Sequence, residues 1–261
     1  MADREKILRY FRDSEDEDLA AKLLDLAEGA KKTQKYRLSG FLDPHELQVA
    51  EIVAANFENI EIRTDGGFRY AERQRAAFVS QEFLGNIDFE IACFFLEWDK
   101  RYYDITHRDI LGAFMGLGCK REALGDIIFA NDGAQFVADK NLAVFLLNEF
   151  KTVGKATIKL KEIAFEDLQQ KEEKVKIISA TVADLRLDAV AAAGYGISRS
   201  RMTEEIKGQS VKLNWQVAKK ASQAVEQGDV ISFRGKGRLE IAEVRGTTKK
   251  GRIGVTLKRI L

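Results

Sequence analysis

The spacing of apolar residues near the start of the chain is helical. In residues 3–30 they recur every three or four positions on either side of an acidic run at 14–18, which predicts two short helices. Asp43 can cap a further helix, Pro44 suits its first position, and Glu46 completes a capping box. The sequence therefore predicts a third helix that begins at Pro44.

After this helix, the spacing of apolar residues predicts first a strand and then another helix. Residues 59–64 alternate between apolar and polar positions and predict a short strand. Residues 71–83 return to a helical spacing and predict another helix. We expect residues 1–85 to form a mostly helical N-terminal region with a little sheet.

The middle of the chain, residues 86–165, alternates between strand-like and helical segments. In chain order the pattern predicts a strand at 88–98, a helix that is capped by Thr106 and ends near Gly116 or Gly118, strands at 126–130 and 134–138, a helix at 142–150 and a strand at 156–163. This β-α-β-β-α-β order is typical of a ferredoxin-like or RRM-like domain. The charged stretch 166–174 is expected to be a helical or flexible connector.

The last part of the chain, residues 175–261, predicts a small α/β module. The predicted elements are a strand at 175–182, a short helix from Leu187 that ends at Gly194–Gly196, a helix at 199–206 capped by Ser198, and strands that start at Lys212, at 230–233, at 239–244 and at 253–257. The whole chain is therefore expected to be an α+β protein.

Charge distinguishes the two ends of the chain. Residues 181–261 carry 16 Lys and Arg against 8 Asp and Glu, whereas residues 1–180 carry 26 against 33, so the net charge of +1 conceals an asymmetry. Such an asymmetry favours a polyanion-binding C-terminal module on an acidic body. The alternative is a basic surface that is merely solvated.

Composition and motifs exclude several classes of protein. No apolar stretch approaches the length of a membrane span, the N-terminus mixes acids with bases unlike a signal peptide, and Cys93 and Cys119 are too few for a disulfide framework. No P-loop, dinucleotide fingerprint or Cys/His cluster occurs, and His45 and His107 sit beside acids at predicted helix starts, where capping turns are common. We expect a cytoplasmic protein, a monomer with no membrane partner, no enzymatic activity, no cofactor and no metal.

Five motifs in the basic module occur in a specific order. They are Arg186-Leu187-Asp188, Ser198-Arg199-Ser200-Arg201, Val211-Lys212-Leu213-Asn214-Trp215, Gly228-Asp229-Val230-Ile231 and Arg234-Gly235-Lys236-Gly237-Arg238. In order and spacing they resemble the RNA-binding domain named after ribosomal protein S-four, over about residues 183–240. The resemblance implies two short helices and a following turn that present basic side chains to structured RNA. The chain departs from that family at Gln209, where Gly is usual.

The chemistry of these residues fits phosphate recognition. Arg199 and Arg201 lie in the first turn of a capped helix, where free N–H groups and the helix dipole also favour phosphate. Asp188 is expected to orient a neighbouring Arg or backbone group, and Asn214 either contacts RNA or braces its strand. The residues expected to bind RNA are Arg186, Ser198, Arg199, Arg201, Lys207, Lys212, Asn214, Arg234, Lys236 and Arg238.

Upstream motifs extend the resemblance over nearly the whole chain. The segments at 66–75, 106–112, 116–122 and 125–127 are similar to those of the YlmH family, which combines an N-terminal region, an RRM-like middle and an S-four-type module. The resemblance implies a ribosome-associated RNA-binding protein. Members are linked to bacterial ribosome quality control, on the large subunit carrying obstructed peptidyl-tRNA. Ribosomal RNA, with transfer RNA as a further candidate, and the large subunit are therefore the expected partners.

The sequence leaves open whether the middle domain also contacts RNA and whether the protein has another function. Its third predicted strand offers only Phe136 for base stacking, so RRM-type stacking is not expected. A second basic patch or a solvated helix face is expected from Arg73, Arg75, Arg108, Lys120 and Arg121. Two other functions stay open: an RNA-modifying enzyme that docks through the C-terminal module, and a protein-interaction factor in cell division or photosystem assembly. Arg-Leu-Asp also carries the catalytic Asp of pseudouridine synthases, but too few residues follow Asp188 for their catalytic domain.

Overall fold

The computed structural model describes residues 4–12, 14–130, 132–169, 175–248 and 251–260. The chain divides into two compact units, residues 1–171 and residues 172–261.

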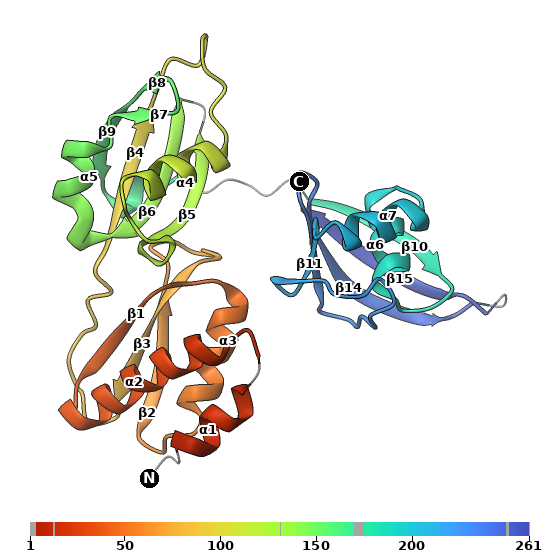
Figure 1. The fold of residues 1–261 in the computed structure, drawn as a ribbon, viewed down its shortest axis with the longest axis horizontal. Coiled ribbons are helices and arrows are strands. Elements are labelled where there is room, and N and C mark those ends of the chain that lie inside the picture. Colours follow the sequence, from red (N-terminus) through yellow and green to blue (C-terminus); the bar gives the residue numbers. More distant parts are fainter. Residues whose placement is uncertain (1–3, 13, 131, 170–174, 249–250, 261) are drawn as a thin grey trace. The chain divides into compact units, whose positions relative to one another are not determined.

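The first unit contains two sheets that follow each other in the chain (Figure 1). Its helices and strands are α1 (Arg4–Phe11), α2 (Glu17–Thr33), β1 (Tyr36–Leu42), α3 (Pro44–Ala54), β2 (Ile60–Asp65), β3 (Gln74–Ser80), β4 (Ile91–Glu97), α4 (His107–Gly116), β5 (Leu124–Ala130), β6 (Gly133–Asp139), α5 (Ala143–Glu149), β7 (Thr152–Val153), β8 (Ala156–Thr157) and β9 (Lys159–Ile163). Short 3-10 turns occur at Arg121–Ala123, Lys140–Leu142 and Phe165–Asp167.

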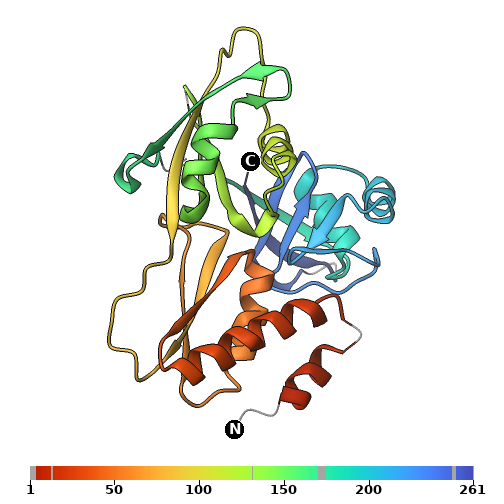
Figure 2. The ribbon, with the colours of Figure 1, turned by 60° about the vertical axis from the view of Figure 1, so that its left-hand side comes forward.

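The N-terminal sheet is covered on one face by helices. Its antiparallel strands lie in the order β1-β3-β2, and α2 and α3 pack against one side of it (Figure 2). The predicted helices of residues 3–30 and the helix start at Pro44 are confirmed. The backbone N–H of Glu46 donates to Asp43 Oδ1 at 3.0 Å, and the backbone N–H of Asp43 donates to Glu46 Oε2 at 2.7 Å.

The helix predicted at 71–83 is wrong. Residues 74–80 form β3, the central strand, and β1 beside it occupies a segment for which the pattern predicts no element. Six consecutive residues of β3, Arg75 to Ser80, are buried, and the strand has partners on both edges. A strand buried in this way lacks the alternation of apolar and polar positions by which strands are identified.

The second sheet has the predicted ferredoxin-like order. Its antiparallel strands lie in the order β5-β6-β4-β9, and α4 and α5 cover one face around a core that includes Phe94, Phe114, Phe136 and Phe150. The capping box at Thr106 and Asp109 is present. The single strand predicted at 156–163 is interrupted at the buried Ile158, which separates β8 from β9.

The other face of this sheet is covered in part by residues 167–169, which follow β9 in the chain. Gln135 on β6 is buried, and its side-chain amide donates to the Asp167 carbonyl at 2.9 Å while its Oε1 accepts from the Gln169 N–H at 2.7 Å. Leu168 packs there with Val137 in a buried cluster. The first part of the predicted connector therefore packs on the sheet, and residues 170–174 lie outside the described residues.

The second unit is a small module with two helices on one face of a sheet. Its elements are β10 (Val175–Val182), α6 (Leu187–Tyr195), α7 (Arg199–Lys207), β11 (Val211–Leu213), β12 (Gln216–Val217), β13 (Val230–Phe233), β14 (Gly237–Thr247) and β15 (Ile253–Ile260). The strand order is β10-β15-β14-β13-β11-β12. Both predicted helices are confirmed, and α6 ends at Gly196 in the left-handed conformation. No helix within the described ranges is long and apolar enough to cross a lipid bilayer.

Close packing of α6 on β14 depends on Gly194. A Cβ atom at this position would lie 2.2 Å from Cδ2 of the fully buried Leu239, which is shorter than any van der Waals contact. We expect Gly194→Val to destabilise this unit by about 1–3 kcal/mol. Thermal unfolding followed by Trp215 fluorescence in a Trp98→Phe background measures the effect. Gly208→Ala is the control, because its Cβ has nothing nearer than 3.4 Å; equal losses would contradict the packing argument.

Candidate RNA-binding surface

Two arginines in the second unit are held by one buried carboxylate. Arg186 donates from Nε and Nη2 to the two oxygens of Asp188, at 3.2 Å each. Arg199 donates from Nε and Nη2 to the same two oxygens at 3.0 and 3.1 Å. The Asp188 side chain is only 5% exposed. We call Arg186, Asp188 and Arg199 the arginine clamp.

The clamp keeps the carboxyl group ionised. Burial by itself would raise the pKa of Asp188, but hydrogen bonds from Arg186 and Arg199 outweigh burial and hold the pKa below its usual value. The prediction that Asp188 orients neighbouring arginines agrees with this geometry. Because both oxygens are saturated by guanidinium donors, Asp188 is not presented as a reactive carboxylate.

The arginine side chains of the clamp are still partly exposed to solvent. The side chains of Arg186 and Arg199 are 37% and 45% exposed, so part of each planar fork remains open. Such forks bind phosphate oxygens in a bidentate manner, and fixing them in advance lowers the entropy lost on binding. The clamp therefore presents two oriented cations at the start of α6 and α7.

Five of the other predicted cations have solvent-accessible side chains. Arg201, Lys207, Lys212, Arg234 and Lys236 are exposed, and within the described parts of the chain none has a side-chain partner. Arg238 is half-buried on β14. Ser198 caps α7, since its Oγ accepts from the Arg201 backbone N–H at 3.2 Å, so this hydroxyl is engaged by the helix.

The turn after α7 forms although Gln209 stands where the family has Gly. Gln209 adopts a left-handed φ of 56°, and the N–H of Ser210 closes the helix end on the Glu205 carbonyl at 3.0 Å. The Ser210 carbonyl then accepts from the Arg234 N–H at 2.9 Å. This contact brings the basic turn between β13 and β14 beside the end of α7.

Asn214 has the bracing role in this structure. Its Nδ2 donates to Asp229 Oδ1 at 2.8 Å, and its Oδ1 accepts from the Val230 N–H at 2.9 Å. The strand predicted to include Asn214 ends at Leu213, and Asn214 lies in the turn that follows. Its amide is therefore engaged within the protein.

Sequence reasoning missed one cation that the fold adds to this surface. The guanidinium of Arg259, on β15, lies 5.2 Å from the centre of the Tyr195 ring and donates to the Lys236 carbonyl at 3.3 Å. Nothing in the local pattern separates Arg259 from the neighbouring Lys258. Pairing of β14 with β15 alone brings it to the basic turn.

The five residues of the predicted second basic patch differ in exposure. Arg75 is buried and the Arg73 side chain is only 12% exposed, with Nη2 donating to the Phe41 carbonyl. Arg121 is half-buried, and burial, together with Arg73, lowers its pKa to about 10. Only Arg108 and Lys120 of the five are exposed. Arg73 and Arg75 therefore cannot contribute to a basic surface patch as predicted, since their guanidiniums bond inside the protein.

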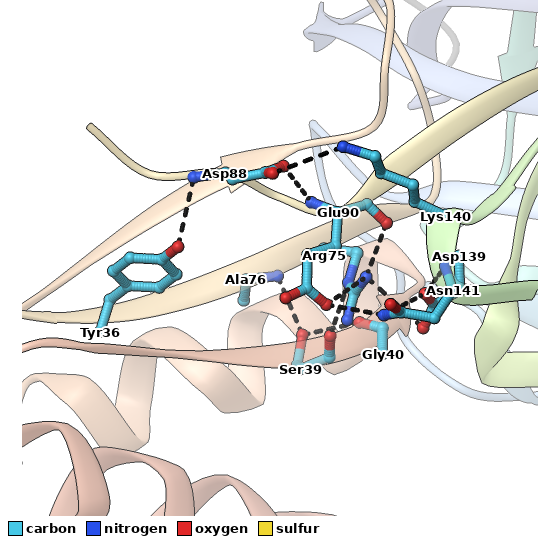
Figure 3. Close-up of polar contacts among 10 residues, drawn as sticks. All are labelled: Tyr36, Ser39, Gly40, Arg75, Ala76, Asp88, Glu90, Asp139, Lys140 and Asn141. Carbon is cyan, nitrogen blue, oxygen red and sulfur yellow. Dashed lines mark hydrogen bonds and ion pairs between the residues drawn. The ribbon is translucent and has the colours of Figure 1, made fainter.

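Arg75 joins the two sheets of the first unit (Figure 3). From β3 its Nε donates to the Ser39 carbonyl at 2.9 Å and its Nη1 donates to the Glu90 carbonyl at 3.0 Å. Asp139, at the end of β6, lies 3.6 Å from Nη1. Glu90 adopts a left-handed φ of 51°, and its carbonyl also accepts from the Lys140 N–H. One buried guanidinium thus connects β1 and β3 with the strand ends of the second sheet.

In the part of the chain that the structure describes, no group of three or more His, Cys, Asp or Glu side chains is placed to hold a metal ion. His45 Nε2 lies 2.9 Å from Asp16 Oδ1, beside the starts of α3 and α2.

Comparisons with known proteins agree with this architecture. Family models for the N-terminal part of YlmH, the putative RNA-binding domain in YlmH, and the S4 domain match residues 15–83, 85–167 and 185–231. The description of the middle family names RNA binding. The ribosome-associated protein quality control protein P2 of Bacillus subtilis (strain 168) is 34% identical over 226 residues, which cover 86% of this chain and 88% of that protein.

A solved structure shares the fold of the part of this chain that aligns with it. The cell division protein YlmH from Streptococcus pneumoniae aligns with a TM-score of 0.51 at 23% identity, covering 59% of this chain and 95% of that one. Three family models in order, and a relative matched over most of both chains, establish the relationship. The chain belongs to the YlmH family, with an RNA-binding domain in its middle and an S4 domain at its C-terminal end.

Proposed function

We propose that this protein binds structured RNA on the large ribosomal subunit, without catalysis, and acts in the quality control of stalled translation in the cytoplasm. The arginine clamp is the observation that carries the proposal, because it fixes two cations for phosphate binding at the surface of the S4 domain. The relative named as a ribosome-associated quality control protein supports the ribosome as the site of action. Ribosomal RNA is the expected contact, with transfer RNA as a second.

The same geometry argues against an RNA-modifying reaction at Asp188. A nucleophilic carboxylate needs an open oxygen beside the substrate. Asp188 has both oxygens bonded to guanidinium groups, and its side chain is almost fully covered.

Co-sedimentation with purified ribosomal subunits tests the proposal. The informative variant is Arg201→Glu with Lys212→Glu, because both side chains are exposed and neither has a partner among the described residues, so folding is preserved. We expect the wild type to pellet with large subunits at about 0.1 M salt and the variant to bind at least about tenfold more weakly. The slope of log affinity against log salt should also fall by about two, one for each lost phosphate contact.

A variant with the same change of charge elsewhere completes the test. Lys22→Glu with Lys32→Glu reverses two exposed lysines on α2 and should pellet like the wild type. Equal loss in both variants would mean that net charge, and not this surface, governs binding. Absence of wild-type protein from the pellet, even with tRNA-obstructed large subunits, would refute the ribosome proposal.

A further inference from the structure

The turn between β11 and β12 has an unusual residue at its second position. Asn214 and Trp215 are the two loop residues, with φ of 47° and 66°. Two consecutive positive φ values are the mark of a type I′ hairpin turn, which favours Asn at the first position and Gly at the second. Asn214 fits, whereas Trp215 places a bulky side chain where Gly is preferred, at a conformational cost.

The side chain that causes this cost is not part of the core. Trp215 is half-buried and is absent from the buried cluster that the module forms between its sheet and helices. The other tryptophan of the chain, Trp98, is by contrast buried, with Nε1 donating to the Tyr103 carbonyl at 3.0 Å. Core packing therefore does not account for a tryptophan at this turn.

The surroundings of the turn are cationic. Lys212, on the strand that enters the turn, is exposed. Lys219 and Lys220, just after the strand that leaves it, are exposed as well. The next residue, Ala221, accepts from the Asp188 N–H at 3.0 Å, so this segment leads back to the arginine clamp. An aromatic residue flanked in the chain by exposed cations is the combination with which proteins bind unpaired nucleotides.

We propose that Trp215 stacks on an unpaired base of the RNA, next to phosphate contacts made by Lys212 and Lys220. This inference rests on the proposed RNA-binding function and adds a contact to a base, where the predicted residues contact phosphates. Because every base has a π-face, the stacking contact tolerates sequence differences and reports local RNA structure, namely a base free of its helix.

Fluorescence tests the contact directly. The chain contains two tryptophans, so Trp98→Phe leaves Trp215 as the only indole. Titration of this variant with deproteinised large-subunit ribosomal RNA is expected to quench Trp215 emission in a saturable manner, because a stacked base quenches an indole. Binding of the RNA without any change in Trp215 emission would overturn the proposal.

Two substitutions at the position separate stacking from packing. Trp215→Gly suits the turn and should fold, yet should bind the RNA at least about fivefold more weakly, as the loss of one stacked base implies. Trp215→Phe keeps a ring and should retain most of the affinity. If Trp215 only packs, Trp215→Gly will lower the melting temperature but leave the affinity of the folded protein unchanged, which would refute the inference.

The phosphate variant distinguishes the two proposals. Weak binding by Arg201→Glu with Lys212→Glu, together with unchanged binding by Trp215→Gly, would leave the proposed function standing and remove only the stacking contact. Failure of the wild type to bind the ribosomal RNA would refute both.

Discussion

Replacement of Arg75 by Met is expected to destabilise the first unit by about 3 kcal/mol or more. The substitution keeps much of the aliphatic volume but removes the buried donors that satisfy the Ser39 and Glu90 carbonyls, and it leaves Asp139 without its cation. Loss of one partner from a buried charged network is among the most costly single changes in a protein. Urea unfolding followed by Trp98 fluorescence, in a Trp215→Phe background, reports this unit alone.

The control for Arg75 is a solvent-exposed arginine of the same region. Arg69 is exposed and only approaches the ring of the exposed Tyr70, at 4.8 Å. We expect Arg69→Met to change the free energy of unfolding by less than about 0.5 kcal/mol. If the two variants were equally stable, Arg75 would not be the residue that joins the two sheets.

Replacement of Asp188 by Asn is expected to weaken both the stability of the second unit and its affinity for RNA. An amide cannot accept four hydrogen bonds from two guanidinium groups, so Arg186 and Arg199 lose their fixed orientation. Because both arginines are partly solvated, we expect a loss of about 2 kcal/mol in the free energy of unfolding. Trp215 fluorescence in the Trp98→Phe background measures it.

In strong acid, Asp188→Asn and the wild type should have the same free energy of unfolding. The pKa of Asp188 is lower in the folded state than in the unfolded chain. Its contribution is therefore fully present above the unfolded pKa, about 3.9, and is lost as the pH falls through the folded value. Wild type and Asp188→Asn should differ in urea unfolding at neutral pH and converge in strong acid. An equal difference at both pH values would contradict an ionised clamp.

Asp184 supplies the matched control for Asp188. It lies 3.6 Å from Arg199 and 3.7 Å from Arg186, but its side chain is 44% exposed. Solvated ion pairs contribute little to stability, so Asp184→Asn should cost less than about 1 kcal/mol. If Asp184→Asn cost as much stability as Asp188→Asn, both Asp184 and Asp188, and not Asp188 alone, would orient the two arginines.

Local signals in the sequence were sufficient for the helix starts. Asp43 with Glu46, Thr106 with Asp109, and Ser198 make capping contacts within three residues, which is why the sequence predicts α3, α4 and α7 correctly. The order of strands and helices in the middle domain is likewise local, because turn residues and alternation mark each element. The family resemblance added the RNA-binding character, which the charge asymmetry alone had left open.

Contacts between residues far apart in the sequence determined the strand β3 and the burial of Arg75. Residues 74–80 become a strand because β1 and β2 pair with them from both sides, and their own spacing favours a helix. Arg75 has the same sequence signature as an exposed basic residue, and only the closure of two sheets around it makes it structural.

At the RNA-binding surface, the sequence by itself determined which residue types are available, and the tertiary structure determined what each does. Basic residues and the Arg-Leu-Asp motif are visible in the chain, but the bonds of Arg199 to Asp188 span eleven residues and depend on how α6 packs beside α7. Likewise the strain at Trp215 exists only because β11 and β12 pair in a register that leaves two loop residues. Sequence encodes local conformation directly, whereas burial and partners arise only when distant segments meet.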